Sequence, residues 1–326
     1  MIRIKIVGVG SYLPEKIINN FDLEKMVDTT DEWITERTGI KERRIVRDDQ
    51  ATSDLCYEAS IRALEMAQIK PEEIDVIIVA TSTPDTVYPS TACWLQKRLK
   101  TKGQGAFDVS AGCSGFLYAF LLAGSLIESK VAKKILVCGG EVMSKVVNWE
   151  DRATCVLFGD GAGACVVVES NGESGILSAN LGADGSLAEL LYQPAGGTRL
   201  PASERTVKEK LHYVHMKGRE VFKHAVIWMG KAAEKALKDA NVSIDDIKLF
   251  IPHQANMRII KTTNERTKIP DEKTFIVLHK YGNMSAATIP VALDEAYRAG
   301  KIKDGDLILM SAFGTGFTWA GMVYKW

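Results

Sequence analysis

The sequence repeats itself at long range, and this repeat constrains the fold more than any other feature. Residues 63–82 align without a gap on residues 236–255, a shift of 236 − 63 = 173 positions. The same shift places the apolar run from Ile135 on the run from Ile308, and a shift of 313 − 158 = 155 aligns Phe158-Gly-Asp-Gly with Phe313-Gly-Thr-Gly. Three matches in one order indicate two similar halves. We therefore predict one half over residues 1–171 and a second over residues 172–326.

Short apolar strands alternate with amphipathic helices in each half. Residues 75–81 form a run typical of a strand buried on both faces. Residues 54–68 show the hydrophobic periodicity of an amphipathic helix with one solvent-exposed face. This alternation predicts an α/β protein with mostly parallel sheets. Two halves related by a pseudo-twofold axis would face one crevice at the carboxyl ends of their strands, where open sheets bind ligands.

Composition argues against several classes of function. The chain has 41 basic and 41 acidic side chains, so no overall field favours nucleic acid or a membrane surface. No apolar run reaches the roughly 18–20 residues of a membrane helix. The N-terminal segment is typical of a first strand rather than a secretory leader. The six cysteines lie far apart without a C-x-x-C pair, which indicates reduced thiols. We expect a cytoplasmic protein.

Cys113 is the first candidate for chemistry. It lies in Ala106-Phe-Asp-Val-Ser-Ala-Gly-Cys-Ser-Gly-Phe, where a short strand, 106–109, runs into a turn of small residues and then an apolar helix, 116–127. Such a turn leaves room for a ligand beside the sulfur. The helix dipole favours thiolate by about 0.3–1 kcal/mol, and by up to about 2 kcal/mol. We therefore expect a reactive thiol of lowered pKa; the alternative is a small core residue, as for the other cysteines.

The second half supplies two further candidates. His253 directly follows an apolar strand and could transfer a proton near neutral pH, although a structural histidine is the alternative. Asn283 lies in the loop that the 173-residue shift pairs with the Cys113 turn, where a Gly-Asn pair alone would indicate only a turn. Phe313-Gly-Thr-Gly could aim backbone N–H groups at an oxyanion. The other histidines form no spaced set, so we expect no metal.

These motifs resemble the β-ketoacyl-acyl carrier protein synthase III family, condensing enzymes that initiate type II fatty acid synthesis. The resemblance rests on TTDEWITERTGIKERR, DVSAGCSGF, FGDGAGA, PHQANMRI, GNMSAAT and SAFGTGFTWAG, in the order of the family. It implies the thiolase-like fold, with two duplicated α/β halves in an αβαβα layering, and a homodimer. The implied reaction condenses an acyl-CoA primer, acetyl-CoA being the expected one, with malonyl-acyl carrier protein, with loss of carbon dioxide. CoA is then a substrate, and no cofactor is implied.

The resemblance also assigns residues to a ping-pong cycle. Cys113 would carry the acyl group, His253 and Asn283 would stabilise the enolate, and backbone N–H groups of Cys113 and Thr315 would form the oxyanion hole. The remaining implied contacts are those of Trp33, Arg37, Arg152 and Asn256 with CoA, of Arg258 with the carrier protein, and of Tyr88 with an acyl pocket across the dimer.

Arg219 departs from the pattern of the family. It stands where the family often has a small polar residue, so its contact with the substrate is open.

The sequence leaves two alternative functions to consider. The chain could be another thiolase-fold acyl-CoA condensing enzyme, but a thiolase would carry a second cysteine near the last strand, and residues 311–316 contain none. It could also be a catalytically silent binding protein of that fold. The retained Cys, His and Asn argue against a silent protein.

Overall fold

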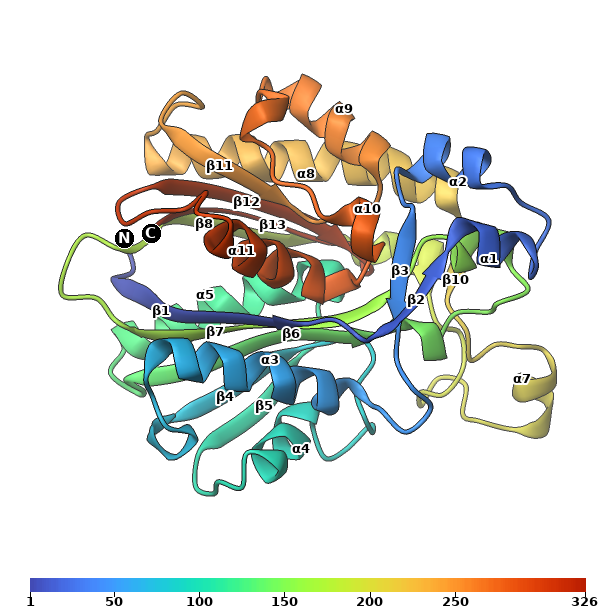
Figure 1. Cartoon of the computed structure of the whole chain (residues 1–326), viewed down its shortest axis with the longest axis horizontal. Helices are drawn as coiled ribbons and strands as arrows, with labels where there is room; N and C mark the ends of the chain where they lie inside the picture. The colour runs from blue at the N-terminus through green and yellow to red at the C-terminus, as the bar shows by residue number, and fades with distance from the viewer.

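The computed structural model describes residues 1–326 and contains two large β-sheets, stacked with helices between and outside them, and two small two-stranded sheets (Figure 1). The first sheet has, in spatial order, β1 (Ile4–Tyr12), β7 (Asp160–Glu169), β6 (Lys134–Val142), β4 (Val76–Ala80) and β5 (Gly105–Val109). β4 is parallel to β5 and β6, whereas β7 is antiparallel to β1 and β6. The sheet is therefore mixed.

The second sheet repeats the order of the first. Its strands are, in the corresponding order, β8 (Gly175–Ala183), β13 (Thr318–Lys325), β12 (Leu307–Gly314) and β11 (Ile247–Pro252). Only β11 and β12 are parallel. The prediction of mostly parallel sheets was wrong, because a buried apolar run looks the same in either direction. At the place of β5, a single parallel bridge joins Phe250 to Thr274.

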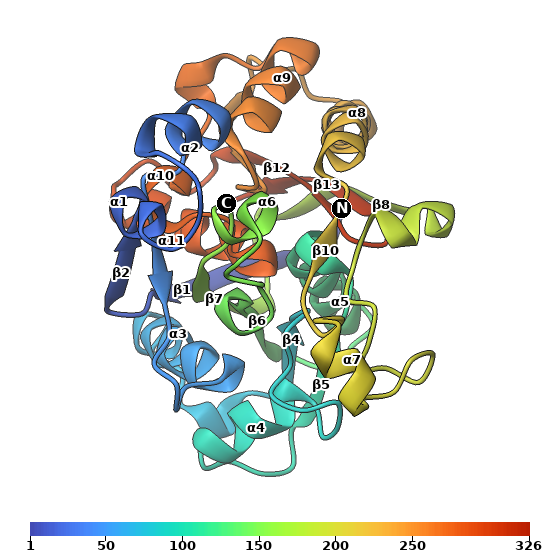
Figure 2. The ribbon, with the colours of Figure 1, turned by 90° about the vertical axis from the view of Figure 1, so that its right-hand side faces the viewer.

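The helices complete five layers, α-β-α-β-α (Figures 1 and 2). Between the sheets lie α5 (Gly115–Glu128) and α11 (Thr288–Arg298); the outer faces are covered by α3 (Thr52–Ala67), α4 (Thr91–Arg98), α8 (Gly218–Ala240) and α9 (Met257–Thr267). Shorter elements are β2 (Lys16–Asn19), β3 (Glu42–Ile45), α1 (Asn20–Glu24), α2 (Asp31–Thr38), α6 (Arg152–Cys155), β9 (Leu191–Tyr192), α7 (Glu204–Lys208), β10 (His215–Met216) and α10 (Leu278–Tyr281). The predicted α/β, thiolase-like layering is confirmed.

One apolar core joins the two halves. The central helix α5 carries no charge before Glu128, and most of its residues are buried, while Leu122 and Ser125 reach the surface. A cluster of 34 buried residues includes Ile4 and Phe120 from the first half and Ile289 and Met310 from the second. The predicted division after residue 171 falls between β7 and β8, the last strand of one sheet and the first of the other. The division of the chain into halves at this residue remains a prediction.

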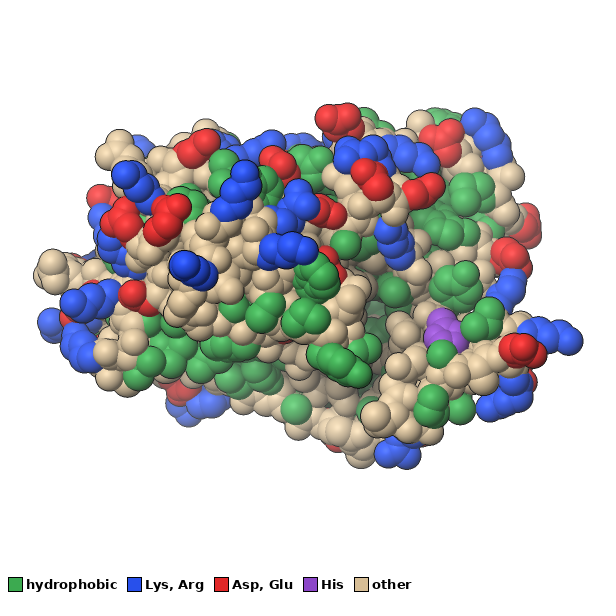
Figure 3. Space-filling model, turned by 90° about the horizontal axis from the view of Figure 1, so that it is seen from below, with side chains coloured by type: hydrophobic (Ala, Val, Ile, Leu, Met, Phe, Trp, Pro, Cys, Tyr) green, Lys and Arg blue, Asp and Glu red, His purple; other side chains and the backbone are tan.

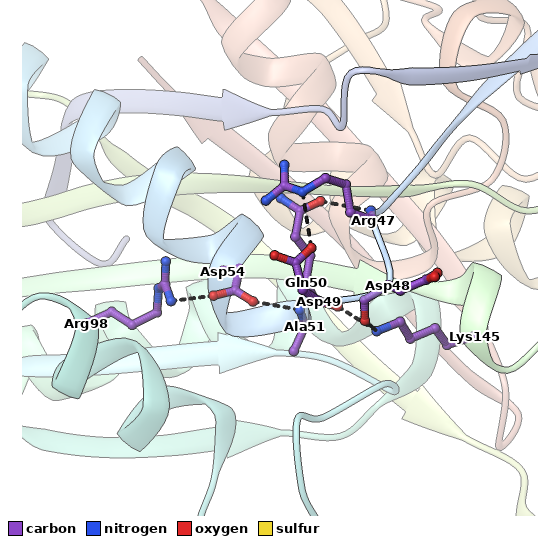
Figure 4. A network of polar contacts seen from close by, with 8 residues as sticks. All are labelled: Arg47, Asp48, Asp49, Gln50, Ala51, Asp54, Arg98 and Lys145. Carbon is purple, nitrogen blue, oxygen red and sulfur yellow. Dashed lines mark hydrogen bonds and ion pairs between the residues drawn. The ribbon is translucent and has the colours of Figure 1, made fainter.

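Polar contacts fix the loop before α3 (Figure 4). Asp54 accepts a hydrogen bond from the backbone N–H of Ala51 at 2.7 Å and pairs with Arg98 of α4 at 2.5 Å. Lys145, from the 3-10 turn after β6, donates to the carbonyl oxygen of Gln50 at 2.7 Å. These bonds hold the carboxyl end of β6 against α3 and α4. No helix of the chain combines the length and the apolar character needed to span a bilayer.

Candidate active site

Two repeat-related turns face each other at the centre of the molecule. The 3-10 turn η2 (Gly112–Ser114) leads into α5, and η6 (Ser285–Ala287) leads into α11. The 173-residue shift pairs Gly112 with Ser285, since 112 + 173 = 285, and both adopt left-handed backbone angles, with φ of +54° and +45°. A Cβ on Gly112 would lie 2.7 Å from the backbone nitrogen of Thr315. Glycine is therefore required in the turn that presents Cys113.

The three predicted reacting residues line one cavity. Cys113, His253 and Asn283 come from η2, the end of β11 and the loop before η6, and they meet at a cavity of about 650 Å³. A second cavity, of about 280 Å³, begins at Cys113 and also contacts Ser285 and Thr315. Cys113 thus lies where a larger and a smaller space join.

Burial, and not the helix dipole, sets the protonation of Cys113. Desolvation raises the pKa of its thiol from 9.0 to about 12; the Ser285 hydroxyl lowers that pKa, and the negative charge of Glu141 raises it. A dipole contribution of about 2 kcal/mol corresponds to roughly 1.5 pKa units, which is too little to reverse this rise. The expectation of a thiolate produced by the helix terminus was wrong. The resting group is a neutral thiol that needs a proton acceptor.

His253 is a neutral imidazole tied to Thr288. Its side chain is buried, which lowers its pKa from 6.5 to about 3. Its Nδ1 lies 2.7 Å from the Thr288 hydroxyl oxygen, which lies 3.0 Å from the carbonyl oxygen of Ser285. The hydroxyl has one proton. If it donates to Ser285, the imidazole proton lies on Nδ1; if it donates to Nδ1, the proton lies on Nε2.

Asn283 has a fixed amide with free donors. The backbone N–H of Ser285 donates to its Oδ1 at 2.8 Å, which orients the side chain. Its own backbone N–H donates to the carbonyl of Leu157 at 2.8 Å, and its carbonyl accepts from Gly159 at 3.1 Å. Because Oδ1 is occupied and Asn283 lines the larger cavity, the Nδ2 group is left to donate to a ligand.

The turn after β12 packs directly on the nucleophile turn. A Cβ on Gly314 would overlap the backbone nitrogen of Cys113. The hydroxyl of Thr315 donates to the carbonyl of Leu191, while its backbone N–H has no acceptor within the chain. Two N–H groups, of Cys113 and Thr315, therefore lie on neighbouring turns beside the sulfur, as an oxyanion hole requires.

Two arginines contact the ring of Trp33. The guanidinium carbons of Arg37 and Arg152 lie 4.8 Å and 4.9 Å from the ring centroid. Arg37 also lines the larger cavity, and Arg152 donates to the carbonyl of Asp28 at 2.7 Å. This cationic and aromatic cluster gathers the predicted CoA contacts on α2 and α6.

The other predicted contact residues lie in three different surroundings. Asn256 caps α9, accepting from the backbone of Arg258 at 2.8 Å, and donates to the carbonyl of Arg37 at 3.1 Å, so it joins α9 to α2. Arg258 is exposed at the larger cavity and lies over Phe222. Tyr88 is 84% exposed and lines neither cavity, so its predicted role would require a second copy of the chain.

Three polar residues near the reacting centre, Ser285, Thr288 and Glu141, were not predicted from the sequence. Ser285 and Thr288 stand in the GNMSAAT motif itself, and their position opposite the Cys113 turn was available from the repeat. Glu141 is the one acidic residue in the strand β6, which is otherwise mostly apolar. Because acidic side chains are rarely buried, its position in such a strand could have marked it as a functional candidate. No group of three or more His, Cys, Asp or Glu side chains is placed to hold a metal ion.

Comparisons with known proteins agree on one family. A family model described as 3-oxoacyl-[acyl-carrier-protein (ACP)] synthase III matches residues 107–185, and the model of the C-terminal part of the same enzymes matches residues 237–326. The chain is 57% identical to the beta-ketoacyl-[acyl-carrier-protein] synthase III of Caldanaerobacter subterraneus subsp. tengcongensis, over 98% of this chain and 97% of the relative. It is 51% identical to that of Desulfitobacterium hafniense strain Y51, over 100% and 98%.

Solved structures give the same result. The crystal structure of 3-oxoacyl-[acyl-carrier-protein] synthase III from Aquifex aeolicus has a TM-score of 0.92 and 50% identity, covering 99% of this chain and 100% of that one. The enzyme from Thermus thermophilus has a TM-score of 0.91 and 44% identity, covering 98% of each chain. The chain therefore belongs to the β-ketoacyl-[acyl-carrier-protein] synthase III family, and it is an acyltransferase of the condensing type that initiates fatty acid synthesis.

Proposed function

We propose that the chain condenses a short acyl-CoA with malonyl-acyl carrier protein in a ping-pong cycle carried by Cys113, His253 and Asn283. The observation that supports this most is that these three side chains, a thiol, a neutral imidazole and an amide with free donors, line one cavity. No ATP or metal is needed, because one thioester is exchanged for another and loss of carbon dioxide drives carbon–carbon bond formation.

In the first half-reaction Cys113 attacks the thioester carbonyl of the primer. The backbone N–H groups of Cys113 and Thr315 stabilise the negative charge that forms on the carbonyl oxygen; one such donor contributes about 10²–10³ to the rate. CoA leaves through the larger cavity. The acyl chain remains in the cavity of about 280 Å³, which has ample room for an acetyl group.

In the second half-reaction His253 and Asn283 hold the malonyl thioester. Their Nε2–H and Nδ2–H groups donate to its carbonyl oxygen and stabilise the enolate formed as carbon dioxide leaves. For this role the Thr288 hydroxyl donates to Nδ1 of His253, so that the imidazole proton lies on Nε2 toward the cavity. The enolate carbon then attacks the acyl-cysteine and gives the 3-oxoacyl product.

Binding of the two carriers uses the cationic mouth of the larger cavity. The adenine of CoA stacks with Trp33 between Arg37 and Arg152, whose charges also attract its phosphates. Asn256 keeps α2 and α9 together beside the pantetheine arm. Arg258 stands exposed at the same mouth, where it meets the acidic carrier protein.

The working assembly is a cytoplasmic homodimer in this proposal. Figure 3 shows a face on which apolar side chains gather with few charges among them. Val87 and Tyr88 are among the most exposed large apolar side chains of the chain, at 83% and 84%. All six cysteines are free thiols, which suits a reducing compartment. Light scattering after size-exclusion chromatography should give twice the mass of the chain; a monomer would contradict the dimer.

Intact-mass spectrometry tests the central step. Incubation with acetyl-CoA should add the mass of one acetyl group, and peptide mapping should place it on Cys113; label elsewhere, or none, would refute the mechanism. His253→Ala and Asn283→Ala should still take up the acetyl group but lose decarboxylation of malonyl-acyl carrier protein by about 10²-fold or more each. If both half-reactions fell equally, the roles of these two residues would be misassigned.

A further inference from the structure

Glu141 is a buried carboxylate without a cation. Its side chain is fully buried near the end of β6, and no Lys or Arg pairs with it. Every partner is a donor: the backbone N–H groups of Ser82 at 3.1 Å and Ala286 at 3.4 Å, and the hydroxyls of Thr81 at 3.3 Å, Thr83 at 2.6 Å and Ser285 at 2.8 Å. The carboxyl group of Glu141 therefore only accepts hydrogen bonds, as an ionised carboxylate does. An unpaired buried anion is costly, so its presence beside a reacting centre points to function.

Ser285 connects this carboxylate to the nucleophile. Its hydroxyl donates to Oε1 of Glu141 at 2.8 Å. Ser285 and Cys113 line the same small cavity, from the two turns η6 and η2 that contact each other, and the Ser285 hydroxyl lowers the pKa of the thiol. Ser285 has a left-handed backbone, with φ +45°, and its carbonyl oxygen lies 3.0 Å from the Thr288 hydroxyl oxygen. The Ser285 hydroxyl therefore links the carboxylate of Glu141 to the cavity that the thiol of Cys113 lines.

The alternative acceptor for the thiol proton is His253. Burial lowers the pKa of that imidazole to about 3, which makes it a weak base, whereas burial raises the pKa of Glu141 and makes its carboxylate a stronger one. The negative charge of Glu141 is the one charge among the causes that shift the pKa of Cys113. Of the two acidic or basic groups near the sulfur, the carboxylate is the better acceptor.

We propose that the Ser285 hydroxyl takes the proton of Cys113 during acylation and passes its own proton to Glu141. This inference rests on the proposed function of Cys113. The sulfur forms its bond to the acyl carbon as the bond from that carbon to the CoA sulfur breaks. The CoA thiolate then takes up one proton, which Glu141 returns through Ser285 or through water, so thiol and thioester are exchanged without net loss of protons. Ser285 is the catalytic residue here, and Glu141 is the positioning residue that acts through it.

The pH profile of acylation alone tests the relay. The rate of CoA release from acetyl-CoA, without malonyl-acyl carrier protein, is measured for the wild type, Glu141→Gln and Ser285→Gly between about pH 5 and pH 9. The wild-type rate should rise and then level off once Glu141 is ionised. Both variants should lose about 10²-fold at neutral pH and keep rising about tenfold for each pH unit, because only direct ionisation of the thiol remains. Glycine suits the left-handed backbone at position 285, as Gly112 does in the other half.

Asp160→Asn is the matched control. Asp160 is also fully buried and accepts only, from Val46 and Ser144, but it lines neither cavity. That variant should keep the wild-type profile even if its unfolding temperature falls. Should Glu141→Gln fail to fold, Ser285→Gly decides the question alone. A levelling profile in Ser285→Gly, or an equal loss at every pH, would overturn the relay. Absence of acetyl on Cys113 in the wild type would instead refute the proposed function.

Discussion

Burial gives the reacting residues protonation states that their types alone do not suggest. Cys113 is a neutral thiol and His253 a neutral imidazole, because the protein atoms packed around both groups reduce their hydration. The sequence identified Cys113, His253 and Asn283 through their strand-end positions and through the family resemblance. It could not give their protonation, since desolvation depends on every element packed around the site. The sequence also could not show the role of Thr288, because that role depends on the 2.7 Å contact between its hydroxyl oxygen and Nδ1 of His253.

Thr288→Val should separate the two half-reactions. Valine keeps the shape but removes the hydroxyl that holds Nδ1 of His253, so the imidazole is no longer held with its proton on Nε2. We expect decarboxylation of malonyl-acyl carrier protein to fall by about 10²-fold, with acetylation of Cys113 close to wild type. Thr288→Ser, which keeps the hydroxyl, should behave as the wild type. Nitrogen-15 NMR of labelled histidine should show the altered tautomer, and unchanged spectra with unchanged decarboxylation would refute the role.

At the scale of elements, the repeat predicted more than the strand pattern did. It correctly paired the Cys113 turn with the loop of Asn283, and both turns adopt the same left-handed backbone. It could not show strand direction, and so the sheets are mixed where parallel ones were expected. The direction of a strand relative to its neighbour depends on the connection between them. A hairpin, such as the one from β12 to β13, makes two strands antiparallel, and the residues within a buried strand say little about which connection follows.

Gly112→Ala should damage the oxyanion hole through the element that carries it. Besides the strain of a left-handed alanine, about 1–2 kcal/mol, its Cβ would lie 2.7 Å from the backbone nitrogen of Thr315 and displace that donor. Acylation of Cys113 should fall by about 10²-fold. Gly103→Ala pairs with it as the control, since Gly103 has φ +93° and nothing within 4 Å. It should lose stability in denaturant titrations but not acylation rate; equal acylation in both variants would contradict this account.

At the scale of the whole molecule, the two halves are bound by one core. The central helices α5 and α11 contribute to the same cluster of 34 buried residues, and Ile2 of the first half exchanges two backbone hydrogen bonds with Ile176 of the second, at 2.9 Å and 3.0 Å. Sequence patterning indicated two halves, but a shared core is a matter of packing between distant segments. The role of Tyr88 also depends on packing, in this case against a second copy of the chain, because in the single chain its side chain is exposed.

Residues 1–171 expressed alone should not fold cooperatively. Separation from residues 172–326 would expose the faces of α5 and of the first sheet that pack on the second half. We expect no sharp thermal transition by circular dichroism for either fragment, and recovery of a transition when the two are expressed together. A cooperative transition of the isolated first fragment would show that the halves are independent domains.

The meeting of two cavities at one sulfur has a consequence for inhibitor design. A compound with an electrophilic centre and two arms of unequal size could place the short arm in the space of about 280 Å³ and the long arm in the space of about 650 Å³. Its warhead would then rest at Cys113 in the only orientation that both arms allow. Because the resting thiol is neutral, a reagent that itself delivers a basic group to the sulfur should react faster than one chosen for electrophilicity alone.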